Sequence, residues 1–427
     1  MAEKLYYQDA YLKEFQAEIT EVKKRDGKLL VALNKTAFYP EGGGQRPDGG
    51  TITICKKEKM SSSGASLTSE SPLSNDADRK QELFFTVIDV QEEEGEIWHY
   101  LDANQETEKC LETDVLLQPG QMVVGRIDWN RRFDHMQQHS GEHIISGMIC
   151  SAFDCSNVGF HMGEEEVTID YSARISMEEV LEIEAAANRY LWEDHPFVQM
   201  WPTAKELKTI EYRSKKELEG DVRITSFPGA DCCACCGTHV KSSAEVGLIK
   251  ITSAHNFHEG TRFTLYCGKR ALDYLNRSFQ ANKKTAVLLS TKEERTFEVV
   301  QKQMEEFASL KGRFSQMQED YFKMWAENFE GKEQALIISD RLDPEEGRKL
   351  CDLLADKVSG TAAVFTKVKE NGDETSVFRY AIMNRGEDIS GMIREMNQQL
   401  SGKGGGRNGF AQGNVSVSES AIRRFFS

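Results

Sequence analysis

The chain has 427 residues, of which 39% are hydrophobic and 29% charged, a composition typical of a protein with about two to four globular domains. No apolar run approaches the roughly 20 residues of a membrane helix, and the N-terminus lacks the apolar core of a signal peptide. The formal charge of −16 argues against a protein that coats nucleic acid non-specifically, but a local basic groove can still bind RNA. Ten cysteines without a secretory signal favour a reducing compartment, so we expect a cytoplasmic protein.

Residues 1–125 are predicted to form a β-rich, barrel-like domain. Strand-like runs separated by turn residues lie at Leu29–Leu33, Thr51–Cys55, Leu83–Val90 and Glu96–Leu101. A loop between the first two runs contains Thr36, Gln45 and Asp48 around three consecutive glycines, which let a backbone approach another surface closely. The structural alternative is a tight barrel turn. The Ser- and Asp-rich stretch at about 60–80 is predicted to be a disordered insertion.

Residues 126–272 are predicted to form an α/β domain with two pairs of metal-binding side chains. We expect helices at Arg131–Ser151 and Met177–Trp192, and strands at Val167–Tyr171, Glu245–Thr252 and Thr261–Cys267. The first pair is His139 and His143 on the first helix, and the second is Cys235 and His239, predicted in a loop or at a helix start. Residues four apart on a helix share one face, so their side chains can bind one ion.

Each pair has an alternative that involves no shared metal. Two histidines four apart on a helix are more often surface residues than ligands, and Cys232, Cys233, Cys235 and Cys236 could form a separate cysteine-rich zinc knuckle. One site of three imidazoles and one thiolate accounts for both pairs more economically. We therefore predict one Zn²⁺ per chain. Catalytic zinc sites keep a coordination position open, whereas four protein ligands are typical of structural sites, and the sequence leaves that alternative open.

The last third of the chain combines a long helix with a compact domain. Between residues 273 and 330, apolar residues recur at steps of three or four, which predicts a coiled coil that serves as a dimer seam or interdomain strut. Residues 331–427 are predicted to form an α/β domain. It contains a glycine-rich loop, Gly402–Gly413, in which Lys403 and Arg407 flank main-chain N–H groups that suit phosphate or RNA backbone. A structural turn is the alternative.

These motifs together resemble a known family. The pattern His139-x-x-x-His143 with Cys235-Cys-Gly-Thr-His239, the Thr36–Gly50 loop, and Arg132-x-x-His135 are similar to the editing domain of alanyl-tRNA synthetase and to the free-standing AlaX trans-editing proteins. Three shorter segments are also similar in residue type to this family: Val158–His161, Thr168–Asp170 and Gly260–Arg262. The C-terminal glycine loop resembles the domain that marks the long AlaX form. One departure is Cys236, where the synthetases commonly have glycine.

The resemblance implies an α+β multidomain protein that hydrolyses mischarged tRNA(Ala), chiefly Ser-tRNA(Ala) and also Gly-tRNA(Ala). It implies zinc ligation by His139, His143, Cys235 and His239. Catalytic roles would fall to Thr36, Gln45, His139 and His143, and substrate contacts to Thr36, Gln45, Asp48, Asp170, Arg262, Lys403 and Arg407. A homodimer through the coiled coil or the C-terminal domain is a further expectation, and no membrane is involved. The alternative function is an RNA-binding or scaffold protein whose zinc is purely structural.

Overall fold

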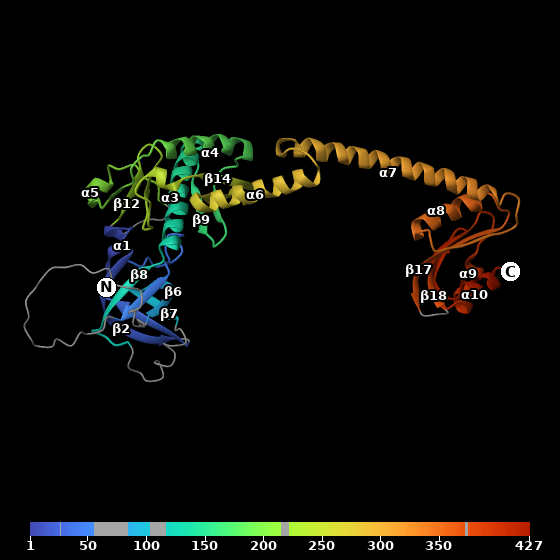
Figure 1. The fold of residues 1–427 in the computed structure, drawn as a ribbon, viewed down its shortest axis with the longest axis horizontal. Coiled ribbons are helices and arrows are strands. Elements are labelled where there is room, and N and C mark those ends of the chain that lie inside the picture. The colour runs from blue at the N-terminus through green and yellow to red at the C-terminus, as the bar shows by residue number, and fades with distance from the viewer. Residues whose placement is uncertain (26, 55–83, 103–116, 215–221, 372–374) are drawn as a thin grey trace, which may run out of the picture. The chain divides into compact units, whose positions relative to one another are not determined.

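The computed structural model describes residues 1–427 except 26, 55–83, 103–116, 215–221 and 372–374, so the insertion predicted at 60–80 lies outside the described residues. The chain divides into two compact units, Met1–Asn282 and Lys283–Ser427 (Figure 1). None of the helices in the described ranges is both long enough and apolar enough to span a bilayer. The mixed α and β architecture predicted from the sequence is confirmed.

The first part of unit 1 is a closed six-stranded barrel, as predicted. Its strands follow the order β2-β3-β7-β6-β5-β8. Their bounds are β2 Glu14–Arg25, β3 Lys28–Leu33, β5 Gly50–Ile54, β6 Phe84–Glu93, β7 Glu96–Asp102 and β8 Met122–Ile127. Alternating apolar residues of these strands, among them Ile19, Ile52 and Phe85, fill the interior with exposed fractions of 1% or less. A short strand β1 (Glu3–Lys4) and helix α1 (Leu5–Gln8) precede the barrel, and β1 pairs in parallel with β4 (Lys35–Thr36).

The second part of unit 1 packs helices on an antiparallel sheet of order β14-β15-β10-β9. Its strands are β9 Asn157–Met162, β10 Val167–Tyr171, β14 Ile249–Phe257 and β15 Gly260–Cys267. Helix α3 (Trp129–Phe153) contacts helix α4 (Met177–Trp192), and the two together contact this sheet. A smaller sheet of order β11-β12-β13 lies beside α3 (Figure 1) and is formed by Val198–Met200, Ile224–Phe227 and Asp231–Ala234. The short helices α5 (Ala204–Leu207) and η1 (Ser243–Val246) complete this part.

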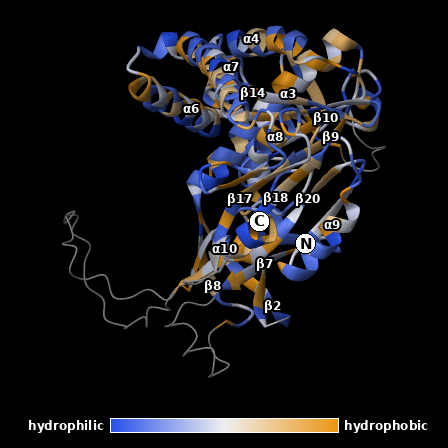
Figure 2. Cartoon of the chain, turned by 90° about the vertical axis from the view of Figure 1, so that its right-hand side faces the viewer, coloured by the Kyte–Doolittle hydropathy of each residue, from blue (hydrophilic) through white to orange (hydrophobic). Residues whose placement is uncertain are grey.

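The predicted long helix is interrupted. Helix α6 (Gly268–Leu288) ends before Ser290, which has a φ of 52°, and a turn with the 3₁₀ segment η2 (Glu293–Arg295) leads into α7 (Thr296–Glu327). A serine in the left-handed region cannot continue an α-helix, which explains the break. Helix α7 carries an exposed apolar row, and Figure 2 shows its mixed hydropathy. The row consists of Phe297, Val300, Met304, Phe307, Leu310, Phe314, Met317, Tyr321 and Met324.

Unit 2 also contains a three-layer α/β domain. Its five-stranded sheet has the order β16-β17-β18-β20-β19, with only β16 and β17 parallel. The strands are β16 Ala335–Ser339, β17 Thr361–Asn371, β18 Thr375–Asn384, β19 Lys403–Arg407 and β20 Phe410–Val417. Helices α8 (Pro344–Ala355), α9 (Ser390–Gln399) and α10 (Glu419–Phe425) complete the domain. Leu350 and Leu354 of α8 belong to one apolar core, whereas Ile393 of α9 and Ile422 of α10 belong to another.

The glycine segment predicted as a loop is a β-hairpin. Strand β19 pairs with β20 through the two-residue turn Asn408-Gly409, where both residues have positive φ. This dipeptide favours the turn type that matches the twist of two antiparallel strands. A Cβ at Gly404 or Gly413 would collide with the hydroxyl of Tyr380, so these glycines let the hairpin lie over that ring. All five residues of the edge strand β19 are exposed.

Candidate metal centre

Helix α3 is polar and nevertheless buried, which is unusual for a core helix. Sixteen of its residues are buried, and they include His135, Gln138, His139, Glu142 and His143. Polar side chains are buried only where hydrogen bonds or a ligand compensate for the loss of water. Asp128 caps the N-terminus by accepting a hydrogen bond from the backbone N–H of Arg131. The helix is therefore fixed at its start and presents a polar face to the interior.

The two predicted ligand pairs come together as one cluster. Ligand atoms of His139, His143, Cys235 and His239 all lie within 4.8 Å of one another. The Sγ atom of Cys235 is 3.4 Å from Nε2 of His139 and 3.6 Å from Nε2 of His239. Zinc bonds of about 2.0–2.1 Å to nitrogen and 2.3 Å to sulfur, at a tetrahedral angle, separate two ligands by about 3.6 Å. The donor types and their spacing fit one Zn²⁺ ion.

A different partner orients the outer nitrogen of each histidine. The Nδ1 atom of His139 lies 2.9 Å from Oε1 of Gln45, and that of His239 lies 3.1 Å from Oγ of Ser140. The Nδ1 atom of His143 lies 2.8 Å from Oδ2 of Asp231. If these nitrogens donate to the three oxygens, each Nε2 carries a lone pair directed into the cluster. These contacts hold the three rings in an orientation that suits metal ligation.

Glycines allow the ligand loop to approach α3 closely. A Cβ at Gly237 would collide with the ring of His139, and one at Gly147 would collide with the backbone carbonyl of Ala230. A larger residue at position 237, between Cys235 and His239, would therefore clash with the ring of His139. The backbone N–H of Gly237 also donates to Sγ of Cys235 at 3.3 Å, which stabilises a thiolate at that position.

The charges of the cluster favour a thiolate beside an imidazolium in the absence of metal. Burial alone would raise the pKa of Cys235, but the charges of His139 and His143 hold it well below the usual range. Burial opposes the charged form of His143, yet the thiolate of Cys235 and the carboxylate of Asp231 raise its pKa to about 10. Burial holds the pKa of His239 well below its usual value. A divalent cation would replace the proton on His143, because metal ligation requires the neutral imidazole.

Gln45 connects the N-terminal glycine loop to the metal centre. Its Oε1 accepts hydrogen bonds from His139 and from the backbone N–H of Thr238 at 2.9 Å, while its Nε2 donates to Oγ1 of Thr238 at 2.8 Å. Thr36 is also buried, where its hydroxyl lies 2.8 Å from Nε2 of His99 and accepts a hydrogen bond from the N–H of Phe38. Of these two predicted residues, Gln45 contacts the metal cluster directly, whereas Thr36 bonds within the barrel.

Three other predicted residues are held in ion pairs. Asp48 is fully buried, pairs with Arg132 and accepts from the N–H of Tyr39. Asp170 and Arg262 face each other across β10 and β15 and form two hydrogen bonds, of 2.6 and 2.7 Å. Because both oxygens of each carboxylate have protein partners, these ion pairs join elements around the centre. Their predicted contact with substrate stays a prediction.

Sequence reasoning missed three buried residues near the ligands. Asp231 orients His143 and also accepts from Nε of Arg213 at 2.7 Å. Ser140 contacts His239, and Oε2 of Glu142 lies 3.9 Å from Nε2 of His143. Ser140 and Glu142 lie between the two helix histidines in the sequence, so their proximity to the metal centre could have been predicted from their position. Asp231 has no such signal, because only the folding of β13 against α3 brings it to His143.

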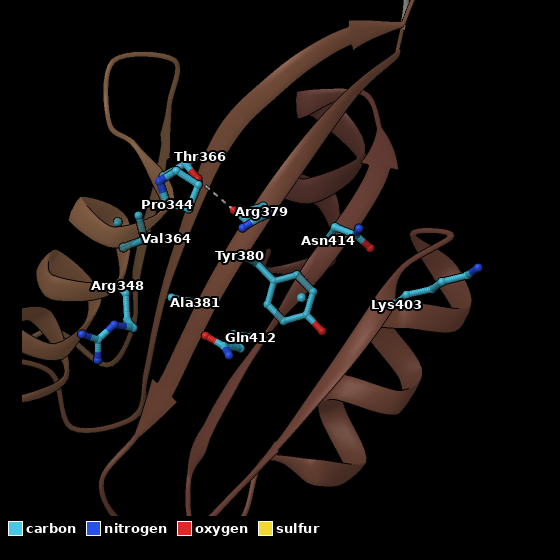
Figure 3. Close-up of a pocket in the computed structure, with 12 residues that line it drawn as sticks. Pro344, Arg348, Val364, Thr366, Arg379, Tyr380, Ala381, Lys403, Gln412 and Asn414 are labelled. Atoms are coloured by element: carbon cyan, nitrogen blue, oxygen red, sulfur yellow. Dashed lines mark hydrogen bonds between the residues drawn. The ribbon is translucent and has the colours of Figure 1, made fainter. Parts of the chain in front are cut away.

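Lys403 and Arg407 lie in unit 2 on the edge strand β19. Lys403 lines a cavity of about 340 Å³, together with Arg348 of α8 and Arg379 of β18 (Figure 3). None of the described residues that line this cavity is acidic, although the chain carries a formal charge of −16. Within the described ranges, no carboxylate pairs with these three cations. The cavity is therefore suited to an anionic ligand, and Arg407 lines a neighbouring depression on the same strand.

Two family patterns match the chain. Residues 222–263 match the threonyl and alanyl tRNA synthetase second additional domain, and residues 332–426 match the DHHA1 domain. The first match includes Cys235 and His239, and the second covers most of the C-terminal α/β domain.

Two of the three similar proteins below align with almost the whole chain, and the third with 70% of it. The chain is 26% identical to the alanyl-tRNA editing protein AlaX-L of Pyrococcus horikoshii, over 99% of this chain and 96% of that protein. An alanyl-tRNA editing protein of Xenopus laevis is 28% identical over 70% of this chain and 73% of its own length. The alanine–tRNA ligase of Pyrococcus abyssi is 26% identical over 96% of this chain, which spans only 42% of the ligase. The resemblance inferred from the sequence motifs is confirmed.

Proposed function

We propose that this chain, similar to an alanyl-tRNA editing protein over nearly its whole length, hydrolyses the ester of mischarged tRNA(Ala) in the cytoplasm. The observation that carries the proposal is the buried cluster of three imidazoles and one thiolate, which fits zinc in a chain whose relatives are named for editing. In the reaction, water adds to the ester carbonyl and the bond to the ribose oxygen breaks. The products are the free amino acid and tRNA with an intact terminal hydroxyl.

His139, His143, Cys235 and His239 would hold one Zn²⁺. When bound, zinc supplies Lewis acidity that can polarise a carbonyl or lower the pKa of water. Gln45 holds His139 and Thr238 in place and would position the centre, a role we propose in addition to contact with the amino acid. Thr36 would favour serine by exchanging the contact of its buried hydroxyl with His99 for one with the serine hydroxyl. A site built to hydrogen-bond an OH discriminates strongly against the analogue that lacks it. Asp48, Asp170 and Arg262 would fix the surrounding elements and the substrate-facing surface.

A deacylation assay on tRNA(Ala) charged with serine, glycine or alanine tests this function. We expect the metal-loaded protein to release serine fastest, glycine more slowly and alanine slowest. The discrimination between serine and alanine should exceed about 100-fold, since the loss of a hydroxyl partner is costly. Equal rates on all three substrates would contradict the proposed serine pocket, and no hydrolysis of any of them would contradict the function.

The second candidate function is RNA binding by a scaffold protein with a structural zinc. The four side-chain donors favour it, because a complete tetrahedral set is typical of structural sites. Removal of the metal separates the two functions. A catalytic site should lose hydrolysis while circular dichroism and tRNA binding are kept, whereas a structural site should lose its local fold and tRNA binding together.

The C-terminal domain would supply affinity for the tRNA. Lys403 and Arg348 around the acid-free cavity, with Arg407 beside it, would contact backbone phosphates. The exposed apolar row of α7 would pair with the same helix of a second copy, as its steps of three and four suit a coiled coil. Such a homodimer would cover large hydrophobic side chains that are otherwise in contact with water.

A further inference from the structure

A pair of aromatic rings adjoins the loop that carries the thiolate ligand. Trp201 follows strand β11 and is 51% exposed. Its ring meets the half-buried ring of Tyr7 edge-on, with centroids 5.5 Å apart and an angle of 74° between the planes. Tyr7 belongs to α1, so the pair joins two distant segments of the chain. Tryptophan and tyrosine are enriched at binding surfaces, and the exposed face of this pair gives a flat ring a place to stack.

Gln199 holds the two segments of this pair together. Its Nε2 donates to the backbone carbonyl of Tyr7 at 3.0 Å. Its Oε1 accepts from Nε and Nη2 of Arg223 at 3.0 and 2.7 Å. One side chain in the edge strand β11 thus fixes the position of Tyr7 and the orientation of a buried guanidinium group.

Arg223 connects the aromatic pair to the metal ligands. Its Nη1 donates to the backbone carbonyls of Cys235 at 3.1 Å and Gly237 at 2.7 Å. Its Cζ lies 5.1 Å from the centroid of Tyr7, a cation–π contact. Among the described residues, no carboxylate pairs with this guanidinium. The buried guanidinium group of Arg223 therefore contacts both the ring of Tyr7 and the loop that holds Cys235.

We propose that Trp201 and Tyr7 form a stacking surface for the adenine base of the terminal nucleoside of the aminoacyl-tRNA. This inference rests on the proposed function, in which the scissile ester is attached to the ribose of that nucleoside. With the ester at the metal centre, the base lies at most one ribose away, in the region of the ligand loop. Every base has a π face, so aromatic stacking binds the terminal nucleoside without adding positive charge to an acidic protein.

Two small substrates that share the ester isolate this contact. One is 2′(3′)-O-seryl-adenosine, and the other is the matching seryl ester of ribose without a base. We expect the protein to show about tenfold higher kcat/KM for the substrate with the base, the size of one stacking contact. Trp201→Ala should lose that preference through KM while its rate on the abasic ester is unchanged, and Trp201→Phe should keep most of it. Trp192→Ala is the matched control, because Trp192 is 72% exposed in the same unit.

An unchanged preference in Trp201→Ala would overturn the stacking surface while leaving the proposed function intact. If the wild-type protein hydrolyses neither ester nor Ser-tRNA(Ala), the proposed function fails, and the surface is tested by calorimetric titration with adenosine. About tenfold weaker adenosine binding to Trp201→Ala than to Trp192→Ala would then support the surface. Equal affinities, or no adenosine binding to any of these proteins, would overturn it.

Discussion

Asp231 is the residue on which the orientation of His143 depends most directly. Its carboxylate bridges Nδ1 of His143 and Nε of Arg213, and both bonds are shorter than 3 Å. We predict that Asp231→Asn lowers zinc affinity by about 10–100-fold, the usual effect of removing a partner of a ligating histidine. Competition with a chromophoric chelator measures it. Glu184→Gln is a matched control, since Glu184 is another buried carboxylate, paired with Lys250. Equal affinities in the two variants would exclude the positioning role.

His99 provides a pH-dependent contribution to the stability of the barrel. Burial lowers its pKa from 6.5 to about 4, so it is neutral when folded and gains a proton on unfolding below about pH 6.5. The contribution of neutral His99 to the free energy of unfolding is complete above pH 6.5 and is lost as the pH falls toward 4. By pH 5 the loss is about 2 kcal/mol. Between pH 7 and pH 5, the free energy of unfolding of His99→Gln should therefore fall by about 2 kcal/mol less than that of the wild-type protein, as measured by urea titration. Parallel losses in both proteins would contradict this assignment.

At the residue scale, spacing sufficed to find the four clustered candidate ligands but not the residues that orient their rings. His139 with His143 and Cys235 with His239 are each four apart, and side-chain chemistry alone suggests a shared ion. Asp231 could not be found in this way, because its position beside His143 depends on how β13 packs against α3. Gln45 was found as a polar residue near glycines, but its hydrogen bond to His139 follows only from the tertiary structure.

At the scale of elements, helix α7 is the one whose sequence pattern requires a partner. We predict that the protein is a dimer and that Phe307→Asp dissociates it, because a charge would be buried in the apolar seam. Ser309→Asp is the control, as it introduces the same charge at an exposed position two residues away on the opposite side of the helix. Sedimentation equilibrium at micromolar concentration measures the change. A monomeric wild-type protein, or a dimeric Phe307→Asp variant, would contradict the seam.

The sequence predicted the long helices and many of the strands, but it missed several strands of unit 1 and two further local features. Apolar periodicity identified α4 and four of the barrel strands, β3, β5, β6 and β7, whereas β2 and β8 were not predicted. The break between α6 and α7 depends on a left-handed Ser290, which has no periodic signal. The glycines of β19 indicated a loop, although they serve to let a hairpin pass over Tyr380.

At the scale of the whole molecule, affinity for tRNA and chemistry on its ester are assigned to different parts of the chain. We predict that the double variant Arg348→Gln and Lys403→Gln raises KM for Ser-tRNA(Ala) without changing kcat. The dependence of log binding constant on log salt should become shallower by about 1 for each phosphate that the variant no longer binds. Hydrolysis of seryl-adenosine should be unaffected in the same variant. An unchanged salt dependence would remove the C-terminal cavity from tRNA binding.

The central claim is that the cluster around Cys235 is a catalytic zinc centre for deacylation. A single-turnover assay on Ser-tRNA(Ala) with zinc-loaded wild-type protein and His139→Ala tests it most directly, with circular dichroism to verify the fold of both. We predict that the wild-type protein releases serine and that His139→Ala, although folded, does so about 100-fold more slowly or worse. Release of serine by His139→Ala at the wild-type rate would contradict the account.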